Sequence, residues 1–231
     1  MSFLILANPR TGSTLLSDLL NSFANIEVAE ELLDSKFEIE GDALMYLQRE
    51  YARMSKPIKG FKVFPCQVIL RNVRFDEIVS TLSVKLVVVL WRKSILEQFV
   101  SLEIAKKTKV WYSTKSSQAV ERIFLSEEKF LNFVEERKQQ WRAIADQWPI
   151  GVHTIFMTYE DLIENTVIEL RRVLDALHCA FDGKVPAIYS AKLNPATLSE
   201  KVLNLNELSD SVKNTELDIE KFLKQLLQQK L

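Results

Sequence analysis

The amino-acid sequence predicts a three-layer α/β fold in which helices flank a central parallel β-sheet. Short runs of apolar and β-branched residues alternate along the chain with longer segments of helical periodicity, which is the order typical of parallel sheets. The chain has 231 residues, 47% of them hydrophobic and 26% charged, so it can bury a large core. We therefore expect a single domain over residues 1–231.

The expected strands are short apolar runs, and the expected helices repeat their apolar residues every three or four positions. The strands are Phe3–Ala7, Ile58–Phe64, Lys85–Trp91 and His153–Met157. The helices are 15–23, Ala43–Met54, Phe75–Leu82, 94–111, Ser126–Trp148 and 216–231. The stretch 182–206 has little periodicity and is expected to be a loop.

Each expected strand is followed by a short segment that contains polar residues. These segments are 8–14, 64–67, 92–94 and 158–161. The carboxyl ends of parallel strands meet at one edge of the sheet, and ligands of such folds bind there. We expect the four segments to converge at this edge.

Composition narrows the function classes. The formal net charge is −1, so there is no overall basic field to attract nucleic acid. With 2 histidines the chain cannot build a His-rich site, and we expect no metal. Cys66 and Cys179 lie far apart, as is typical of reduced thiols in a cytoplasmic protein. Residues 2–7 are too short for a signal peptide, and no apolar run approaches the ~18 residues of a membrane span.

The segment Asn8–Leu16 is the most informative part of the sequence. It joins the first strand to the first helix, so backbone N–H groups and a helix N-terminus point at one place. Arg10 adds a permanent positive charge, and hydroxyl side chains add donors. We predict a phosphate-binding loop formed by Arg10, Thr11, Gly12, Ser13, Thr14 and Leu15. The alternative is a neutral loop in which Ser13 caps the helix.

This loop differs from a Walker A motif, which places Lys-Ser/Thr directly after its last glycine. Here Ser13 follows Gly12, and the cation Arg10 precedes the glycine. A small-molecule kinase would therefore need a degenerate form of the motif. A non-catalytic binding module that retains a nucleotide-binding fold is a further alternative.

A second anion site is predicted where the third expected strand ends at Arg92. Ser94 and Glu97 have the spacing of a capping box, which gives Ser94 a structural role. Ser101 lies seven residues after Ser94, and seven steps of about 100° return to nearly the same helix face. Arg92 and Ser101 can therefore line one edge of the site. Two unrelated surface positions are the alternative.

A loop whose cation precedes its glycine resembles the 5′-phosphosulfate loop of sulfotransferases that use 3′-phosphoadenosine 5′-phosphosulfate (PAPS). Arg92 with Ser101 resembles the pair that holds the 3′-phosphate of PAPS in this family. Residues 158–162 resemble the family's Tyr-Glu-Asp-Leu element, to which we assign a structural role. The sequence is most similar to bacterial carbohydrate sulfotransferases, including the type that acts on trehalose glycolipids.

The resemblance implies a P-loop-like fold of the sulfotransferase type. It also implies PAPS as the sulfuryl donor, without a metal, and a hydroxyl acceptor on a carbohydrate, glycolipid or small natural product. A homodimer is compatible with it. Arg10 takes the place of the cation beside the sulfuryl group, and because a guanidinium keeps its proton we assign it electrostatic stabilisation.

A hydroxyl acceptor needs a general base, and a carboxylate is the candidate. Glu30 and Glu31 follow the first helix, where the chain returns toward the ligand edge. In the trehalose-type enzymes a Pro-Glu-Glu segment at this distance from the loop carries the base, and Ala29 replaces the proline here. We assign Glu31 as the base in preference to Glu30. A solvent-exposed acidic pair is the alternative.

Three further residues are candidates for the acceptor side. Lys62 interrupts a buried strand, so it either orients the acceptor or reaches solvent from an edge. Trp111 and Tyr112 end the long middle helix and are expected either to border the acceptor cleft or to join the core.

Overall fold

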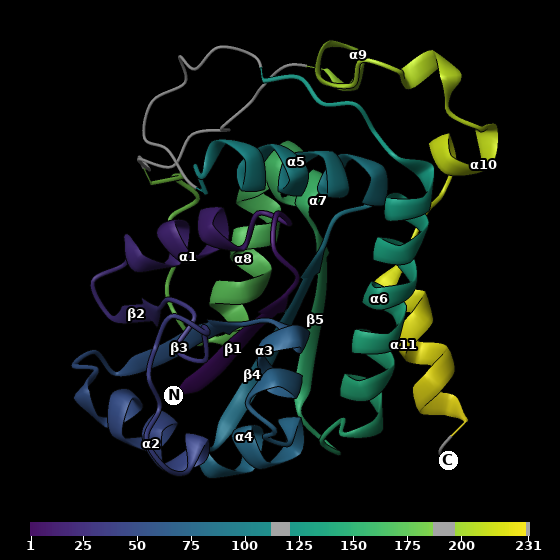
Figure 1. Cartoon of the computed structure of the whole chain (residues 1–231). Helices are drawn as coiled ribbons and strands as arrows, with labels where there is room; N and C mark the ends of the chain where they lie inside the picture. Colours follow the sequence, from purple (N-terminus) through teal and green to yellow (C-terminus); the bar gives the residue numbers. More distant parts are fainter. Residues whose placement is uncertain (112–120, 187–196, 230–231) are drawn as a thin grey trace.

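The computed structural model describes residues 1–111, 121–186 and 197–229. In this part of the chain, five strands form one parallel sheet in the order β2-β3-β1-β4-β5 (Figure 1). The strands are β1 (Ser2–Ala7), β2 (Ile26–Ala29), β3 (Ile58–Val63), β4 (Val84–Trp91) and β5 (His153–Thr158).

The helices lie between successive strands and after the last strand. The first six are α1 (Ser13–Asn21), α2 (Ala43–Arg53), α3 (Pro65–Leu70), α4 (Phe75–Thr81), α5 (Ile95–Thr108) and α6 (Glu127–Asp146). The later ones are α7 (Tyr159–Glu164), α8 (Thr166–Ala176), α9 (Leu198–Lys201), the 3₁₀ turn η1 (Leu205–Glu207), α10 (Asp210–Lys213) and α11 (Ile219–Gln228).

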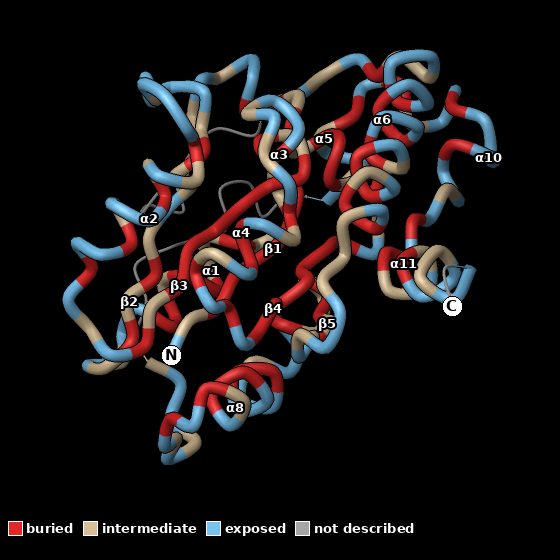
Figure 2. The backbone as a smooth tube through the Cα atoms, turned by 90° about the horizontal axis from the view of Figure 1, so that it is seen from below, coloured by how far each residue is buried: buried red, intermediate tan, exposed pale blue. Residues whose placement is uncertain are grey.

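Helices cover both faces of the sheet and bury an apolar core on each. From β1, Leu4 and Leu6 enter the core shared with α2, α4, α5, α6 and α11, whereas Phe3 and Ile5 enter the core shared with α1 and α8. Figure 2 shows the buried strands between helices on either side. The expected three-layer α/β fold is confirmed.

All four expected strands are present, each shifted by one residue at one end. β2 was not predicted; it is four residues long and lies at the edge of the sheet beside β3. Ile26 and Val28 are buried, and Glu27 between them is partly exposed. This alternation is too short to stand out from the loop around it.

The six expected helices correspond to α1, α2, α4, α5, α6 and α11 to within three residues at each end. The end of α5 comes early because Lys109 adopts the left-handed conformation, with φ 61°, that terminates helices. α3, α7, α8 and α10 were not expected. The expected loop at 182–206 was wrong for residues 198–201 and 205–206, which belong to α9 and η1, and its residues 187–196 lie outside the described ones.

The connections of β1 and β4 run to opposite faces of the sheet, which opens a crevice between their carboxyl ends. After β1, α1 packs on one face and the chain continues to β2. After β4, α5 and α6 pack on the other face and the chain continues to β5. Asn8 and Arg92 are the first residues beyond these two strands. The fold thus brings the loop after β1 beside the segment after β4.

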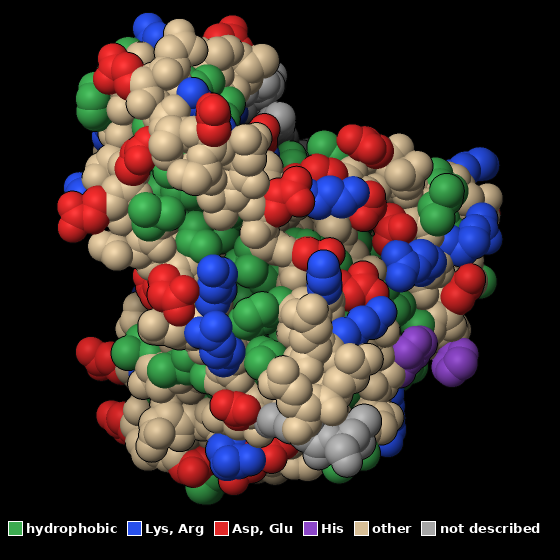
Figure 3. Space-filling model, turned by 90° about the vertical axis from the view of Figure 1, so that its right-hand side faces the viewer, with side chains coloured by type: hydrophobic (Ala, Val, Ile, Leu, Met, Phe, Trp, Pro, Cys, Tyr) green, Lys and Arg blue, Asp and Glu red, His purple; other side chains and the backbone are tan. Residues whose placement is uncertain are grey.

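The surface carries mixed charge. Figure 3 shows Lys and Arg side chains interspersed with Asp and Glu over the displayed face. No helix in the described part of the chain combines the length and apolar character needed to cross a membrane. Over the same residues, no three His, Cys, Asp or Glu side chains are grouped so that they could hold a metal ion.

Candidate active site

The loop between β1 and α1 is fixed from two sides. The buried Asn8 accepts a hydrogen bond of 2.7 Å at Oδ1 from the indole N–H of Trp141 on α6. Thr11, also buried, donates its hydroxyl to the Asn8 carbonyl over 2.8 Å. Gln98 of α5 donates to the Pro9 carbonyl over 2.8 Å. The loop is therefore held in one conformation before any ligand binds, which favours anion binding.

Gly12 is the N-cap of α1 and adopts the left-handed conformation, with φ 84°. A Cβ on this residue would lie 2.5 Å from Cδ2 of Tyr159, so only glycine fits. No capping side chain bonds the first N–H groups of α1, which leaves them available to an anion. Ser13 already lies inside the helix and does not cap it, so the alternative of a loop capped by Ser13 is wrong.

The Arg10 guanidinium lies against α5. Its Nε donates to the hydroxyl of Ser101 over 3.0 Å, and its Nη1 donates to the carbonyl of Trp111. Burial lowers the pKa of Arg10 most strongly, and the positive charge of the nearby Arg92 lowers it further. Among the described residues no carboxylate pairs with Arg10. The structure thus joins the first predicted site to the second, with Ser101 bonded to Arg10 rather than to Arg92.

Arg92 is 9% exposed and is enclosed by acidic and aromatic groups. Its Nη2 pairs with Glu97, and its Nε lies 3.8 Å from a carboxylate oxygen of Glu160. The guanidinium lies over the ring of Tyr159, 4.8 Å from its centroid. Within the described ranges, the buried Nε has no hydrogen-bond partner. An anion placed here would give this donor a partner.

The predicted capping box at the start of α5 is only half formed. Ser94 accepts a hydrogen bond of 3.2 Å from the Glu97 backbone N–H, as expected of an N-cap. The Glu97 carboxylate, however, pairs with Arg92 instead of returning to the backbone of Ser94. Glu97 therefore acts as a counter-ion of Arg92 at the second predicted anion site.

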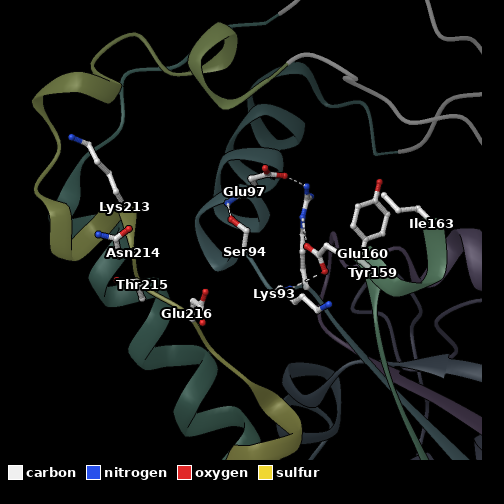
Figure 4. A pocket seen from close by; sticks show the side chains of 11 residues that line it. Lys93, Ser94, Glu97, Tyr159, Glu160, Ile163, Lys213, Asn214, Thr215 and Glu216 are labelled. Atoms are coloured by element: carbon white, nitrogen blue, oxygen red, sulfur yellow. Dashed lines mark hydrogen bonds and ion pairs between the residues drawn. The ribbon is translucent and has the colours of Figure 1, made fainter. Parts of the chain in front are cut away.

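An open cleft of about 460 Å³ lies beside Arg92 (Figure 4). One side of it carries Glu97 and Glu160, and the opposite side is formed by the end of α10, with Lys213, and by the segment after it, with Glu216. A single antiparallel bridge between residues 94 and 216 joins the two sides. The C-terminal part of the chain therefore helps to enclose the cleft beside Arg92, where the second anion site is predicted.

Lys62, near the carboxyl end of β3, is 2% exposed. Its Nζ lies 2.5 Å from Glu30 Oε2 and 3.3 Å from Glu31 Oε1. It also donates to the hydroxyl of Thr14 over 3.1 Å. The alternative that Lys62 reaches solvent from an edge is wrong. Its ammonium instead connects the acidic pair to the first turn of α1, where Leu15 also lies.

Glu30 and Glu31 have different surroundings. The Glu30 side chain is 58% exposed, whereas that of Glu31 is 21% exposed. Glu31 Oε2 accepts a hydrogen bond of 2.9 Å from Gln67. Burial raises the pKa of Glu31, although Lys62 and Gln67 act in the opposite direction. A raised pKa with retained access suits a general base, so Glu31 is the better candidate.

Two residues of the site were not predicted from the sequence: Gln67 in α3 and Arg71 at the C-terminal end of this helix. Arg71 donates to three carbonyls of the loop 33–37, which follows Glu31 and is fixed by these bonds. One feature of the sequence could have indicated Gln67: it is a polar residue within the otherwise apolar run 65–70. Their partners are more than 30 residues away in sequence, so local patterns could not reveal them.

The two aromatic candidates have different outcomes. The Trp111 side chain is 47% exposed, so the alternative that it joins the core is wrong. Its carbonyl contacts Arg10, which places it beside the site. Tyr112 lies outside the described residues.

No protein-family model and no curated protein matches the chain by sequence. Among solved structures, a sulfotransferase from Alicyclobacillus acidocaldarius resembles it with a TM-score of 0.54 and 14% identity, over 98% of this chain and 95% of the other. The fold is a sulfotransferase fold. The sulfotransferase domain of the curacin biosynthetic pathway has a TM-score of 0.49 and 15% identity, over 98% of this chain and 96% of its own.

Mouse sulfotransferase SULT7A1 complexed with PAP has a TM-score of 0.45 and 12% identity, over 78% of this chain and 60% of its own. At such identities the likeness describes the fold, and the expected sulfotransferase type of fold is confirmed by the first structure.

Proposed function

We propose that the protein is a sulfotransferase that moves a sulfuryl group from PAPS to a hydroxyl. The observation that carries the proposal is a pair of donor clusters beyond the carboxyl ends of β1 and β4, which we call the two anion poles. Arg92 and Ser101 form one pole, and Arg10 with the open N-terminus of α1 forms the other. PAPS carries phosphate at both the 3′ and the 5′ position of one ribose, so its recognition calls for two such poles.

The residues present fit this donor. Residues 11–15 would hold its 5′ end through the N–H groups of α1, where Gly12 allows close approach. Arg92 and Ser101 would hold the 3′-phosphate, and Arg10, which donates to Ser101, would contact the sulfuryl group. The partnerless Nε of Arg92 supports this assignment. The proposal requires no metal, because Arg10, Arg92 and Lys62 supply the positive charge.

PAPS, when bound, supplies a sulfuryl group attached to a phosphate leaving group. Glu31 acts as the general base and takes the proton from the acceptor hydroxyl. Lys62 contacts both Glu31 and Thr14, so it holds the acceptor side against the first turn of α1. Arg10 keeps its proton and contributes electrostatic stabilisation only. Glu30 pairs with Lys62 from the solvent side.

For the acceptor we propose a hydroxyl of a carbohydrate, glycolipid or small natural product, and for the reaction a cytoplasmic location. Support comes from the motifs that resemble carbohydrate sulfotransferases. The half-exposed indole of Trp111 offers an apolar surface next to Arg10, of the kind that packs on a sugar ring.

Calorimetric titration with 3′,5′-adenosine bisphosphate (PAP), the desulfated product of PAPS, in EDTA tests the proposal. We expect metal-free binding that Arg92→Ala weakens at least tenfold, because a hydrogen bond to a charged group contributes about 1.5–3 kcal/mol. Arg53→Ala is the control, since Arg53 is exposed on α2 and pairs only with Glu50 among the described residues.

The same titration with ATP and Mg²⁺ separates the alternatives. A preference for ATP with Mg²⁺ would favour a kinase with a degenerate phosphate loop. Binding of PAP without any transfer from PAPS to a panel of hydroxyl acceptors would favour a non-catalytic binding module. Binding of neither nucleotide would contradict the proposed cofactor site.

A further inference from the structure

Gln67 lies at the junction of β3 and α3, and both ends of its amide are bonded. Its Oε1 accepts a hydrogen bond of 3.0 Å from the Phe64 backbone N–H. Its Nε2 donates to Glu31 Oε2 over 2.9 Å. A backbone N–H can only donate, so the amide oxygen must face Phe64 and the NH₂ group must face Glu31. Gln67 is 7% exposed, so water does not compete for either bond.

We propose that Gln67 is the positioning residue of Glu31: it favours the ionised carboxylate and fixes its orientation toward the acceptor hydroxyl. The catalytic part of this inference rests on the proposed sulfotransferase function. The structural part stands on the hydrogen bonds alone.

The two oxygens of Glu31 have separate partners. Gln67 binds Oε2, and Lys62 lies 3.3 Å from Oε1. Each carboxylate oxygen can accept more than one hydrogen bond, so the carboxylate can still receive a hydroxyl. Both partners come from the continuous segment 62–67, which also carries the end of β3. One rigid junction therefore aligns the base and the cation beside it.

The ionisation of Glu31 reflects several opposing groups. Burial raises its pKa most strongly, and the negative Asp34 of the same loop acts in that direction. Lys62 from β3 and Gln67 from α3 favour the ionised form. Glu30 shares Lys62 and so reduces what that ammonium gives to Glu31. Without the Gln67 donor, less opposes the effect of burial, so the pKa of Glu31 should rise.

The test is an NMR titration of ¹³C-labelled glutamate carboxyl groups, with the Glu31 signal identified by its loss in Glu31→Gln. In Gln67→Leu we expect the pKa of Glu31 to rise by about one pH unit, from the loss of a charge-assisted hydrogen bond. Gln67→Glu keeps an acceptor for Phe64 and adds a second carboxyl group, so it should raise the pKa further. Ile69→Ala, on the exposed side of α3, is the control.

A kinetic measurement accompanies the titration. The acidic limb of the pH profile of kcat/KM should move upward by the same amount in Gln67→Leu, while PAP affinity stays within twofold of the parent. An unchanged pKa of Glu31 in both Gln67 variants would overturn the inference. A shifted pKa with an unmoved acidic limb would overturn its catalytic part. A shifted pKa in a protein that binds no PAP would confirm the contact and reject the sulfotransferase function.

Discussion

At the scale of single residues, the acidic pair and Lys62 decide what the site can do. A buried ammonium is retained only when opposite charge and hydrogen-bond acceptors surround it. Lys62 has both, in Glu30, Glu31 and the hydroxyl of Thr14. In this arrangement the exposed Glu30 balances the charge of Lys62, and the half-buried Glu31 can accept a proton.

We expect Glu31→Gln to lower kcat by about 10²–10⁴-fold, the usual contribution of a general base. PAP affinity should not change, because Glu31 contacts neither anion pole. In the parent, activity should fall as the pH is lowered through the pKa of Glu31, which burial raises above its ordinary value. Steady-state kinetics over pH measure both effects. Glu30→Gln is the matched control, and an equal loss in it would contradict the assignment.

Glu97 competes with any anion for Arg92. Glu97→Gln keeps the shape of the side chain and removes its charge, so a phosphate no longer has to displace a carboxylate. We expect PAP to bind about two- to fivefold more tightly, the scale of a partly exposed ion pair. Calorimetry measures the change, with Glu103→Gln elsewhere on α5 as the control. Weaker binding would mean that Glu97 orients Arg92 for the ligand.

The sequence predicted those site residues that come within three residues after a predicted strand, because their place depends on local order. Arg10 and Arg92 are such residues, and both lie at the crevice. The bonds they form could not be predicted: Ser101 was expected beside Arg92, but it bonds to Arg10 across 91 residues of sequence. Gln67 reaches Glu31 across 36 residues. Such contacts depend on the tertiary fold.

At the scale of elements, β1 packs closely beside β3. This packing fixes the end of β1, from which the loop to α1 begins. Gly60 pairs with Phe3 in the parallel register, and a Cβ on Gly60 would lie 2.5–2.7 Å from three atoms of the Phe3 ring. The missing side chain therefore makes room for an aromatic ring, which explains a glycine inside a buried strand.

We expect Gly60→Ala to lower the free energy of unfolding by about 1–3 kcal/mol, the cost of overpacking a core. Urea denaturation measures the loss. In the double variant with Phe3→Leu, the smaller side chain relieves the clash, so the two losses should be less than additive. Full additivity would contradict this explanation.

Elements were predictable where their apolar pattern was long. α6, with twenty residues, and β4, with eight, were both found from their patterns. The four-residue β2 and the six-residue helices α3 and α7 were not, because so few residues show no clear period. α8 has eleven residues, four of them buried, and its pattern was overlooked.

At the scale of the whole molecule, the order of the strands creates the site. The crevice between β1 and β4 brings the guanidinium groups of Arg10 and Arg92 close enough that one lowers the pKa of the other. Two like charges held in a partly buried place oppose folding, and the carboxylates of Glu97 and Glu160 offset the charge of Arg92 but do not pair with Arg10. The protein should therefore be stabilised by a ligand with several negative charges.

We expect PAP at about 100 times its Kd to add about 2.7 kcal/mol to the free energy of unfolding. For a chain of this size, that corresponds to a rise in Tm of about 5–10 °C. Differential scanning fluorimetry in EDTA measures the rise, and adenosine without phosphates is the control. An equal rise with adenosine would mean that the charged poles take no part in binding.

The most direct test of the account is a crystal structure of the complex with PAP. We predict that its 3′-phosphate lies within hydrogen-bonding distance of Arg92 and Ser101, with the Glu97 carboxylate moved away from Arg92. Its 5′-phosphate should lie at the N-terminus of α1, over Gly12. A nucleotide bound outside the crevice between β1 and β4, or with its 3′-phosphate away from Arg92, would contradict the proposed site.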